Sequence, residues 1–102
     1  MAKVIKIENQ KGMYAFWCEG CQCSHFIAVA GNDQNYPAWN FNNDMDKPTV
    51  SPSILVKSTN NGVPTVCHSF IRDGKIQYLS DCTHKLAGQT VDLQDFDDPY
   101  KF

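Results

Sequence analysis

The stretch of sequence that decides the fold is Cys67-His68-Ser69-Phe70-Ile71-Arg72-Asp73-Gly74-Lys75-Ile76-Gln77-Tyr78-Leu79. Asp-Gly supplies the positive φ angles that a two-residue hairpin turn requires. The runs on either side should therefore pair as antiparallel strands, in a register that places Cys67 opposite Ser80. The sequence predicts a C-terminal β-hairpin.

The predicted register divides the hairpin side chains between two faces, because alternate residues of a strand point to the same side. One face is expected to carry Cys67, Ile71, Ile76, Tyr78 and Cys82. His68 and Asp81 are expected on the opposite face. Candidate functional residues therefore lie on both sides of this hairpin.

The rest of the chain is punctuated by prolines and glycines, with short strand-like segments between them. We expect strands at residues 4–7, 13–17, 25–30, 39–42 and 54–56. Pro48 and Pro52 bracket a piece that should be an edge or irregular segment, because proline cannot donate to a sheet ladder. The predicted class is all-β, a small sandwich or partly open barrel, forming one domain over residues 1–102.

Composition narrows the range of functions. The net charge is −2 and the nine Lys and Arg residues are scattered singly, which argues against nucleic-acid binding. No apolar stretch has the length of a membrane span, and the first residues lack the pattern of a signal peptide. We therefore expect a cytoplasmic protein with no membrane partner.

The five cysteines favour a metal site, since clustered Cys and His in a reducing compartment bind metal more often than they form disulfides. Cys18-Glu19-Gly20-Cys21 has the spacing of a zinc knuckle, in which one turn supplies two thiolates. Gly20 should let the backbone turn its amides toward sulfur. We predict that Zn²⁺ is bound here.

The second half of the zinc site is expected from the hairpin. Cys67 and Cys82 would be diagonal neighbours on one face, and His84 follows Cys82 with the same parity if the chain stays extended. This geometry favours Cys18, Cys21 and Cys82, with either Cys67 or His84 as the fourth ligand. Cys23 is left as a spare thiol.

His68 needs a separate explanation, because it faces away from Cys67. One hypothesis is a second, open metal site in which His25, His68 and Asp81 leave room for a hydrolytic water. The simpler interpretation, which we favour at this point, is a hydrogen-bonded histidine at the sheet surface.

Thr49, Ser51 and Ser53 lie among prolines and are interpreted as turn-forming residues. No G-x-S-x-G motif surrounds any serine, and no H-E-x-x-H helix or phosphate-binding loop is present.

The chain resembles a small family of phage and prophage metal-binding proteins whose members often carry the label "ammonia monooxygenase". The resemblance runs through residues 39–42, 48–55, 67–74 and 81–93, with Cys18, Cys21 and His25 upstream. It implies a metal-binding domain, and a peptidase-like or accessory role, since some relatives lie near bacterial ubiquitin-like conjugation genes. Copper monooxygenase chemistry does not suit these residues, because thiolates dominate the ligands and favour zinc.

Two functions follow from these observations. The first is a non-enzymatic module in which structural zinc supports a surface that binds a host or phage protein. The second is a zinc-dependent, peptidase-like hydrolase that uses the open site at His25, His68 and Asp81, although no glutamate lies near a histidine to serve as the base. Thiolate-rich ligation favours the first.

Overall fold

The computed structural model describes residues 2–32 and 36–96, and this part of the chain forms β-strands without a helix. In chain order the strands are β1 (Val4–Lys6), β2 (Met13–Cys18), β3 (Cys23–Ala28), β4 (Asn40–Phe41), β5 (Val50–Asn60), β6 (Val63–Arg72), β7 (Lys75–Tyr78) and β8 (Thr90–Asp92). Within these residues, no helix is long and apolar enough to cross a membrane. The predicted domain also includes residues 1, 33–35 and 97–102, which lie outside the described part.

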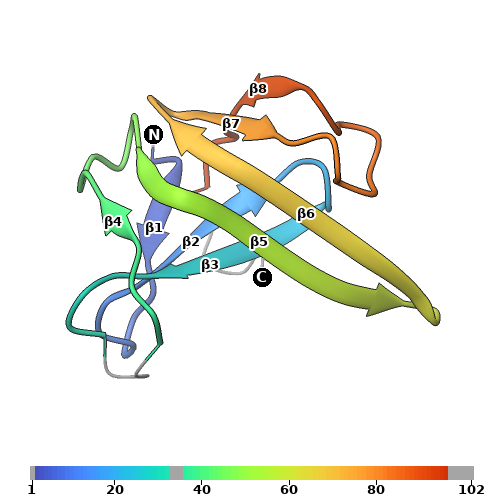
Figure 1. The fold of residues 1–102 in the computed structure, drawn as a ribbon. Coiled ribbons are helices and arrows are strands. Elements are labelled where there is room, and N and C mark those ends of the chain that lie inside the picture. Colours follow the sequence, from blue (N-terminus) through green and yellow to red (C-terminus); the bar gives the residue numbers. More distant parts are fainter. Residues whose placement is uncertain (1, 33–35, 97–102) are drawn as a thin grey trace.

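The strands form two antiparallel sheets, in the orders β1-β2-β3 and β4-β5-β6-β7-β8 (Figure 1). The prediction of an all-β class is confirmed. The two sheets form a sandwich and do not close into a barrel. A long β5–β6 ribbon crosses the front of the molecule in Figure 1 and extends past the smaller sheet.

The predicted hairpin is β6–β7, and its register is confirmed from the turn to the pair of Ser69 with Tyr78, but β7 ends there and the predicted pairing of Cys67 with Ser80 is not formed. Asp73 and Gly74 both have positive φ, at 50° and 76°, and Ile71 pairs with Ile76. The inward face is buried at Cys67, Ser69, Ile71, Ile76 and Tyr78. The Asp-Gly turn therefore determines which side chains of β6 enter the core and which face outward.

β5 differs from the prediction in length and surroundings. It begins at Val50 and continues for 11 residues, whereas a short strand at 54–56 was expected. The register with β6 shifts between Val50 and Ile54, and this irregularity accommodates Pro52 within the strand. Of the two alternatives predicted for the segment between the prolines, the irregular one is confirmed by this shift, whereas the segment is not an edge, because β4 pairs with Val50 and Ser51.

The core lies between the two sheets. Phe16 and Ile27 from the smaller sheet pack with Ile54, Ile71 and Ile76 from the larger one, and all five are almost fully buried. Burial of each such side chain contributes roughly 1.5–3 kcal/mol relative to exposure. This packing fixes the β2–β3 turn against the inner face of β6.

After Tyr78 the chain leaves the regular β7 ladder but continues beside β6 in the same direction, with a turn between Leu79 and Cys82. Leu79 N–H donates to the His68 carbonyl at 2.9 Å, and Thr83 N–H donates to the Val66 carbonyl at 2.9 Å. Residues 79–83 therefore cover the edge of β6 beyond the end of β7. This segment places Asp81 beside β6 on the outer side of the sheet.

Candidate active site and metal centre

Ser53, His68 and Asp81 form a hydrogen-bonded row on the outer face of the larger sheet. His68 Nε2 lies 3.0 Å from Ser53 Oγ, and His68 Nδ1 lies 3.1 Å from Asp81 Oδ2. These distances join a hydroxyl, an imidazole and a carboxylate in the order found in Ser-His-Asp hydrolases. The row can activate the Ser53 hydroxyl as a nucleophile.

Three separate segments position the members of this row. Ser53 follows the register shift in β5, and such irregularities re-aim side chains in many functional sites. His68 is held in β6, where its N–H donates to Cys82 Sγ at 3.2 Å and Cys82 Sγ donates back to the His68 carbonyl at 3.2 Å. Asp81 lies in the segment 79–83 that follows β7, immediately before Cys82.

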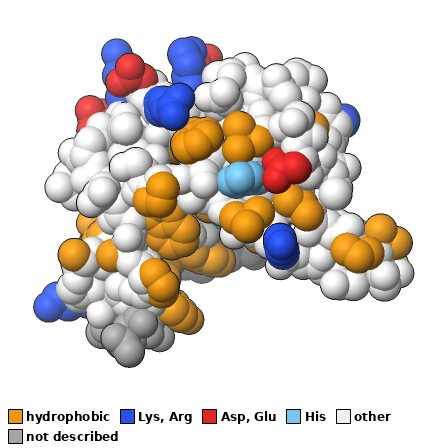
Figure 2. All heavy atoms as spheres, viewed as in Figure 1, with side chains coloured by type: hydrophobic (Ala, Val, Ile, Leu, Met, Phe, Trp, Pro, Cys, Tyr) orange, Lys and Arg blue, Asp and Glu red, His pale blue; other side chains and the backbone are white. Residues whose placement is uncertain are grey.

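The face around the row is apolar and open to solvent. Figure 2 shows a histidine beside an acidic side chain, with hydrophobic side chains around them. Leu55, which pairs with His68, is 49% exposed, and the Arg72 guanidinium covers the Phe70 ring at 4.6 Å. The side chains of His68 and Asp81 are 25% and 56% exposed. A large substrate can therefore reach the Ser53 hydroxyl from this side.

A second cluster lies on the inner side of β6. This cluster consists of Cys18, Cys21, Cys67 and His84. Each residue offers one potential ligand atom, and the four atoms all lie within 4.8 Å of one another. Among the described residues this is the one group of three or more potential ligands that could hold a metal ion. Three thiols and one imidazole form a ligand set used by structural zinc sites.

The local structure supports this Cys–His group. Cys21 N–H donates to Cys18 Sγ at 3.4 Å, and the Tyr78 hydroxyl lies 3.3 Å from the same sulfur. The Tyr78 ring also meets the His84 ring edge to face, with centroids 4.5 Å apart. Gly20 has no positive φ, so its role differs from the predicted one: a Cβ there would collide with the His84 imidazole.

Close packing shifts the pKa values of the thiols in opposite directions. A hydrogen bond from Cys67 lowers the pKa of the Cys18 thiol, with smaller contributions from His25 and Tyr78. The same hydrogen bond, together with burial, raises the pKa of Cys67. Burial and the nearby Cys18 raise the pKa of Cys21. One thiolate is thus favoured among three sulfurs, and a divalent cation would allow the other two to ionise.

His84 provides a test of whether a cation fits the group. Its Nε2 is buried without a hydrogen-bond partner among the described residues, which is costly unless another group satisfies it. Its Nδ1 accepts a 3.2 Å hydrogen bond from Leu86 N–H. A cation bound at Nε2 would satisfy this buried atom, so the group fits a metal ion at this ligand. The ring proton would then lie on Nδ1, which could no longer accept the hydrogen bond from Leu86 N–H.

Cys82 lies outside the group, unlike the arrangement favoured from the sequence. That prediction assumed an extended chain beyond Tyr78, but the chain turns and directs the Cys82 thiol to the backbone of His68. Cys67 and His84, which were predicted as alternatives for the fourth ligand, are both in the group, so one of them takes the place of Cys82. Cys23 is exposed and also lies outside it.

The three residues of the predicted open metal site are divided between two places. His25 is buried in the wall of a cavity of about 540 Å³ that also contains Cys21, Cys67 and His84. His68 and Asp81 pair with each other on the outer face. The second partner of His68 is therefore the Ser53 hydroxyl.

Ser53 is the candidate functional residue that the sequence does not reveal. The sequence around it contains no nucleophile motif, and its partners lie 15 and 28 residues further along the chain. The one available signal was the predicted location of His68 and Asp81 on a shared outer face, opposite the core. That face also carries Ser53.

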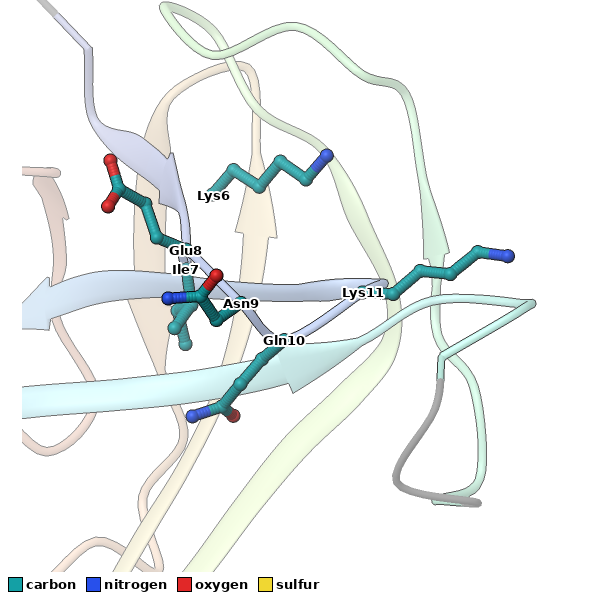
Figure 3. A pocket seen from close by; sticks show the side chains of 6 residues that line it. All are labelled: Lys6, Ile7, Glu8, Asn9, Gln10 and Lys11. Carbon is teal, nitrogen blue, oxygen red and sulfur yellow. The ribbon is translucent and has the colours of Figure 1, made fainter.

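Another hollow lies at the β1–β2 turn and is lined by Lys6, Ile7, Glu8, Asn9, Gln10 and Lys11. Figure 3 shows these side chains spreading in different directions. Their charged and amide groups do not converge on one point, so the hollow is a feature of the turn and not a second chemical site.

The fold and the two clusters define a small two-sheet β domain with a Ser-His-Asp row on one side of β6 and a Cys–His group on the other. The chain belongs to the family described as "Bacterial ubiquitination-like system serine protease (BubE)", whose model matches residues 1–79. The match includes Ser53 and His68 and ends two residues before Asp81. No match was found among the curated proteins or among the solved structures.

Proposed function

We propose that this protein is a serine protease of a bacterial ubiquitination-like system, with Ser53 as nucleophile, His68 as general base and Asp81 as the residue that orients His68. The observation that supports this proposal most strongly is the continuous hydrogen-bonded row. Ser53 Oγ lies 3.0 Å from His68 Nε2, and His68 Nδ1 lies 3.1 Å from Asp81 Oδ2. The family description names the same class of chemistry.

The reaction follows from the order of the row. Ser53 Oγ attacks the carbonyl carbon of a peptide bond while its proton passes to His68 Nε2. His68 then returns this proton to the departing amine, and the C–N bond breaks to leave an ester on Ser53. Water, deprotonated by the same imidazole, hydrolyses the ester and regenerates the hydroxyl. Asp81 accepts the Nδ1–H bond and stabilises the imidazolium formed in both steps.

The metal is proposed to be structural zinc. Four protein ligands complete a tetrahedron and leave no position for a reacting water, so this site suits folding and not hydrolysis. The zinc would hold the β2–β3 turn, β6 and the residue 84 segment together. A zinc hydrolase at His25, His68 and Asp81 lacks support, because His25 lies with the thiols in the inner cavity.

The proposed partner is a polypeptide substrate. The proposed compartment is the cytoplasm, where the five cysteines, free in the structure, would stay reduced.

The decisive experiment exposes a bacterial proteome digest to the purified protein and identifies new peptide termini by mass spectrometry. New termini should appear with the natural chain and be lost with Ser53→Ala. Ser51→Ala is the matched control, because Ser51 is exposed in the same strand and is not part of the row. Equal cleavage by both variants would refute the assignment.

A further inference from the structure

One edge of β5 has no neighbouring strand beside the proposed nucleophile. β4 pairs only with Val50 and Ser51, whereas β5 continues to Asn60. From Leu55 onward most of β5 is exposed. The segment that follows Ser53 therefore offers a strand edge to solvent.

The hydrogen bonds of His68 show which backbone groups of β5 face this edge. His68 N–H and C=O bond to Cys82 and Leu79, so both point away from β5. Residues opposite each other in an antiparallel ladder exchange both hydrogen bonds or neither. Leu55, which is opposite His68, consequently directs its own N–H and C=O away from β6 and toward the open edge.

The same argument applies to Lys57, two residues further along. Its partner Val66 donates to Thr83 Oγ1 at 3.0 Å and accepts from Thr83 N–H at 2.9 Å, on the side away from β5. Lys57 N–H and C=O therefore also face the open edge. Within the described residues, neither Leu55 nor Lys57 has a hydrogen-bonding neighbour on that side.

The other edge of the β5–β6 ribbon is closed. The Val66 backbone is bonded to Thr83, and Pro64, the next residue of the same parity, has no N–H to offer. Proline and covering segments are common means of protecting a strand edge from unwanted pairing. The protected edge is the one remote from Ser53, and the unprotected edge is the one that carries it.

An apolar cavity of about 260 Å³ has Phe26, Tyr36, Pro37 and Trp39 among its walls, and Trp39 is the wall residue that links it to β5. Trp39 also contacts the nucleophile strand, because its indole N–H donates to the Ser53 carbonyl at 3.2 Å. A side chain of a polypeptide lying along β5 can therefore reach an apolar site next to Ser53.

We infer that the substrate is an unfolded polypeptide segment that binds as an added strand along β5, hydrogen-bonded to the backbone of Leu55 and Lys57, with an apolar side chain in the Trp39 cavity. This inference rests on the proposed function and specifies its substrate class. Strand addition at an open edge supplies affinity through main-chain hydrogen bonds and specificity through pockets for alternate side chains. It also holds the scissile bond at a fixed position along the strand that contains Ser53.

The test uses the peptide of the proteome digest that the natural chain cleaves fastest, with single N-methyl groups placed at successive positions. Only alternate residues of an added strand direct their N–H toward the neighbouring edge. We expect kcat/KM to fall about tenfold or more at every second position, the equivalent of one lost hydrogen bond, and to change little between them. A loss without this alternation, or no loss at any position, would overturn strand addition.

Lys57→Pro tests the same contact from the protein side, since proline removes an N–H that faces solvent and leaves the β5–β6 ladder intact. It should lower kcat/KM for the peptide about tenfold, whereas Pro64→Thr on the closed edge should not.

Covalent labelling of Ser53 by a small fluorophosphonate requires no contact with the edge of β5. It therefore tests the proposed serine protease separately from the inferred strand addition. A natural chain that is not labelled contradicts the proposed function. A labelled chain that cleaves no peptide contradicts the protease assignment as well, whereas a labelled, peptide-cleaving protein whose Lys57→Pro variant cleaves as well as the natural chain contradicts the inference alone.

Discussion

Cys67 and His68 are consecutive residues of β6 that belong to different sites on opposite sides of the sheet. Cys67 Sγ lies 3.7 Å from Cys18 Sγ on the inner side, and His68 Nε2 lies 3.0 Å from Ser53 Oγ on the outer side. One strand therefore connects the Cys–His group to the proposed active site. Because the two side chains do not share partners, metal binding and hydrolysis should be separable by mutation.

Asp81→Asn should lower kcat for peptide hydrolysis about 100-fold or more with little change in KM. The amide can present its N–H to His68 and favour the wrong tautomer, and it does not stabilise the imidazolium. Steady-state kinetics on a cleaved peptide measure the effect. Asp92→Asn is the control, because the exposed Asp92 side chain pairs with Lys75 and not with His68. Similar kcat values for the two variants would exclude Asp81 from the mechanism.

Loss of a metal ligand should destabilise the fold. Cys18→Ser and His84→Ala should each abolish the bound zinc and lower the melting temperature by about 10 °C or more, since a structural zinc site contributes several kcal/mol to a domain of this size. Elemental mass spectrometry and thermal unfolding provide the measurements. Cys23→Ser should retain one zinc per chain, because Cys23 is outside the group. Stoichiometric zinc in both ligand variants would disprove the site.

Gly20→Ala should weaken zinc binding without changing any ligand. The added Cβ would occupy the space of the His84 imidazole and displace it from the three thiols. Competition with a chromogenic zinc chelator measures the affinity, which we expect to fall about tenfold or more. Glu19→Ala changes the neighbouring residue of the same turn and should leave the affinity nearly unaltered. An unaffected Gly20→Ala variant would show that the ring has room to move.

Cys82→Ala distinguishes the structure from the ligand set favoured by the sequence. The thiol bonds to the N–H and C=O of His68, so its removal should loosen His68 and lower kcat about tenfold while the zinc content stays at one per chain. Cys82→Ser, which can restore both hydrogen bonds, should recover part of the rate. Loss of zinc in either variant would return Cys82 to the ligand set.

Local signals account for the parts of the fold that the sequence predicts well. Asp73-Gly74 determines a turn, the turn determines a register, and the register separates the face of Cys67 from the face of His68. The length of β5 was underestimated because Pro52 reads as a strand breaker, whereas a register shift absorbs it. The strand β8 has only three residues and is formed by pairing with β7, which no local pattern indicates.

The two sites differ in how far the sequence can predict them. Cys18 and Cys21 are recognisable because a single turn sets their spacing, and Cys67 because the hairpin sets its face. The presence of both Cys67 and His84 in the group, and the absence of Cys82 from it, depend on where the chain bends after Tyr78, which is a tertiary effect. Ser53 meets His68 only through the pairing of β5 with β6, so no motif around the serine could reveal it.

Covalent labelling by a small fluorophosphonate tests the central claim most directly, because it requires only that the serine displace fluoride from phosphorus with the histidine as base. The labelled residue is identified by mass spectrometry of the digested protein. The account predicts one phosphonate group per chain on Ser53, with the labelling rate lowered about 1,000-fold or more in His68→Ala, a variant that should keep its zinc and its melting temperature. An unlabelled Ser53 in a folded, zinc-containing protein, or equal labelling in His68→Ala, would contradict it.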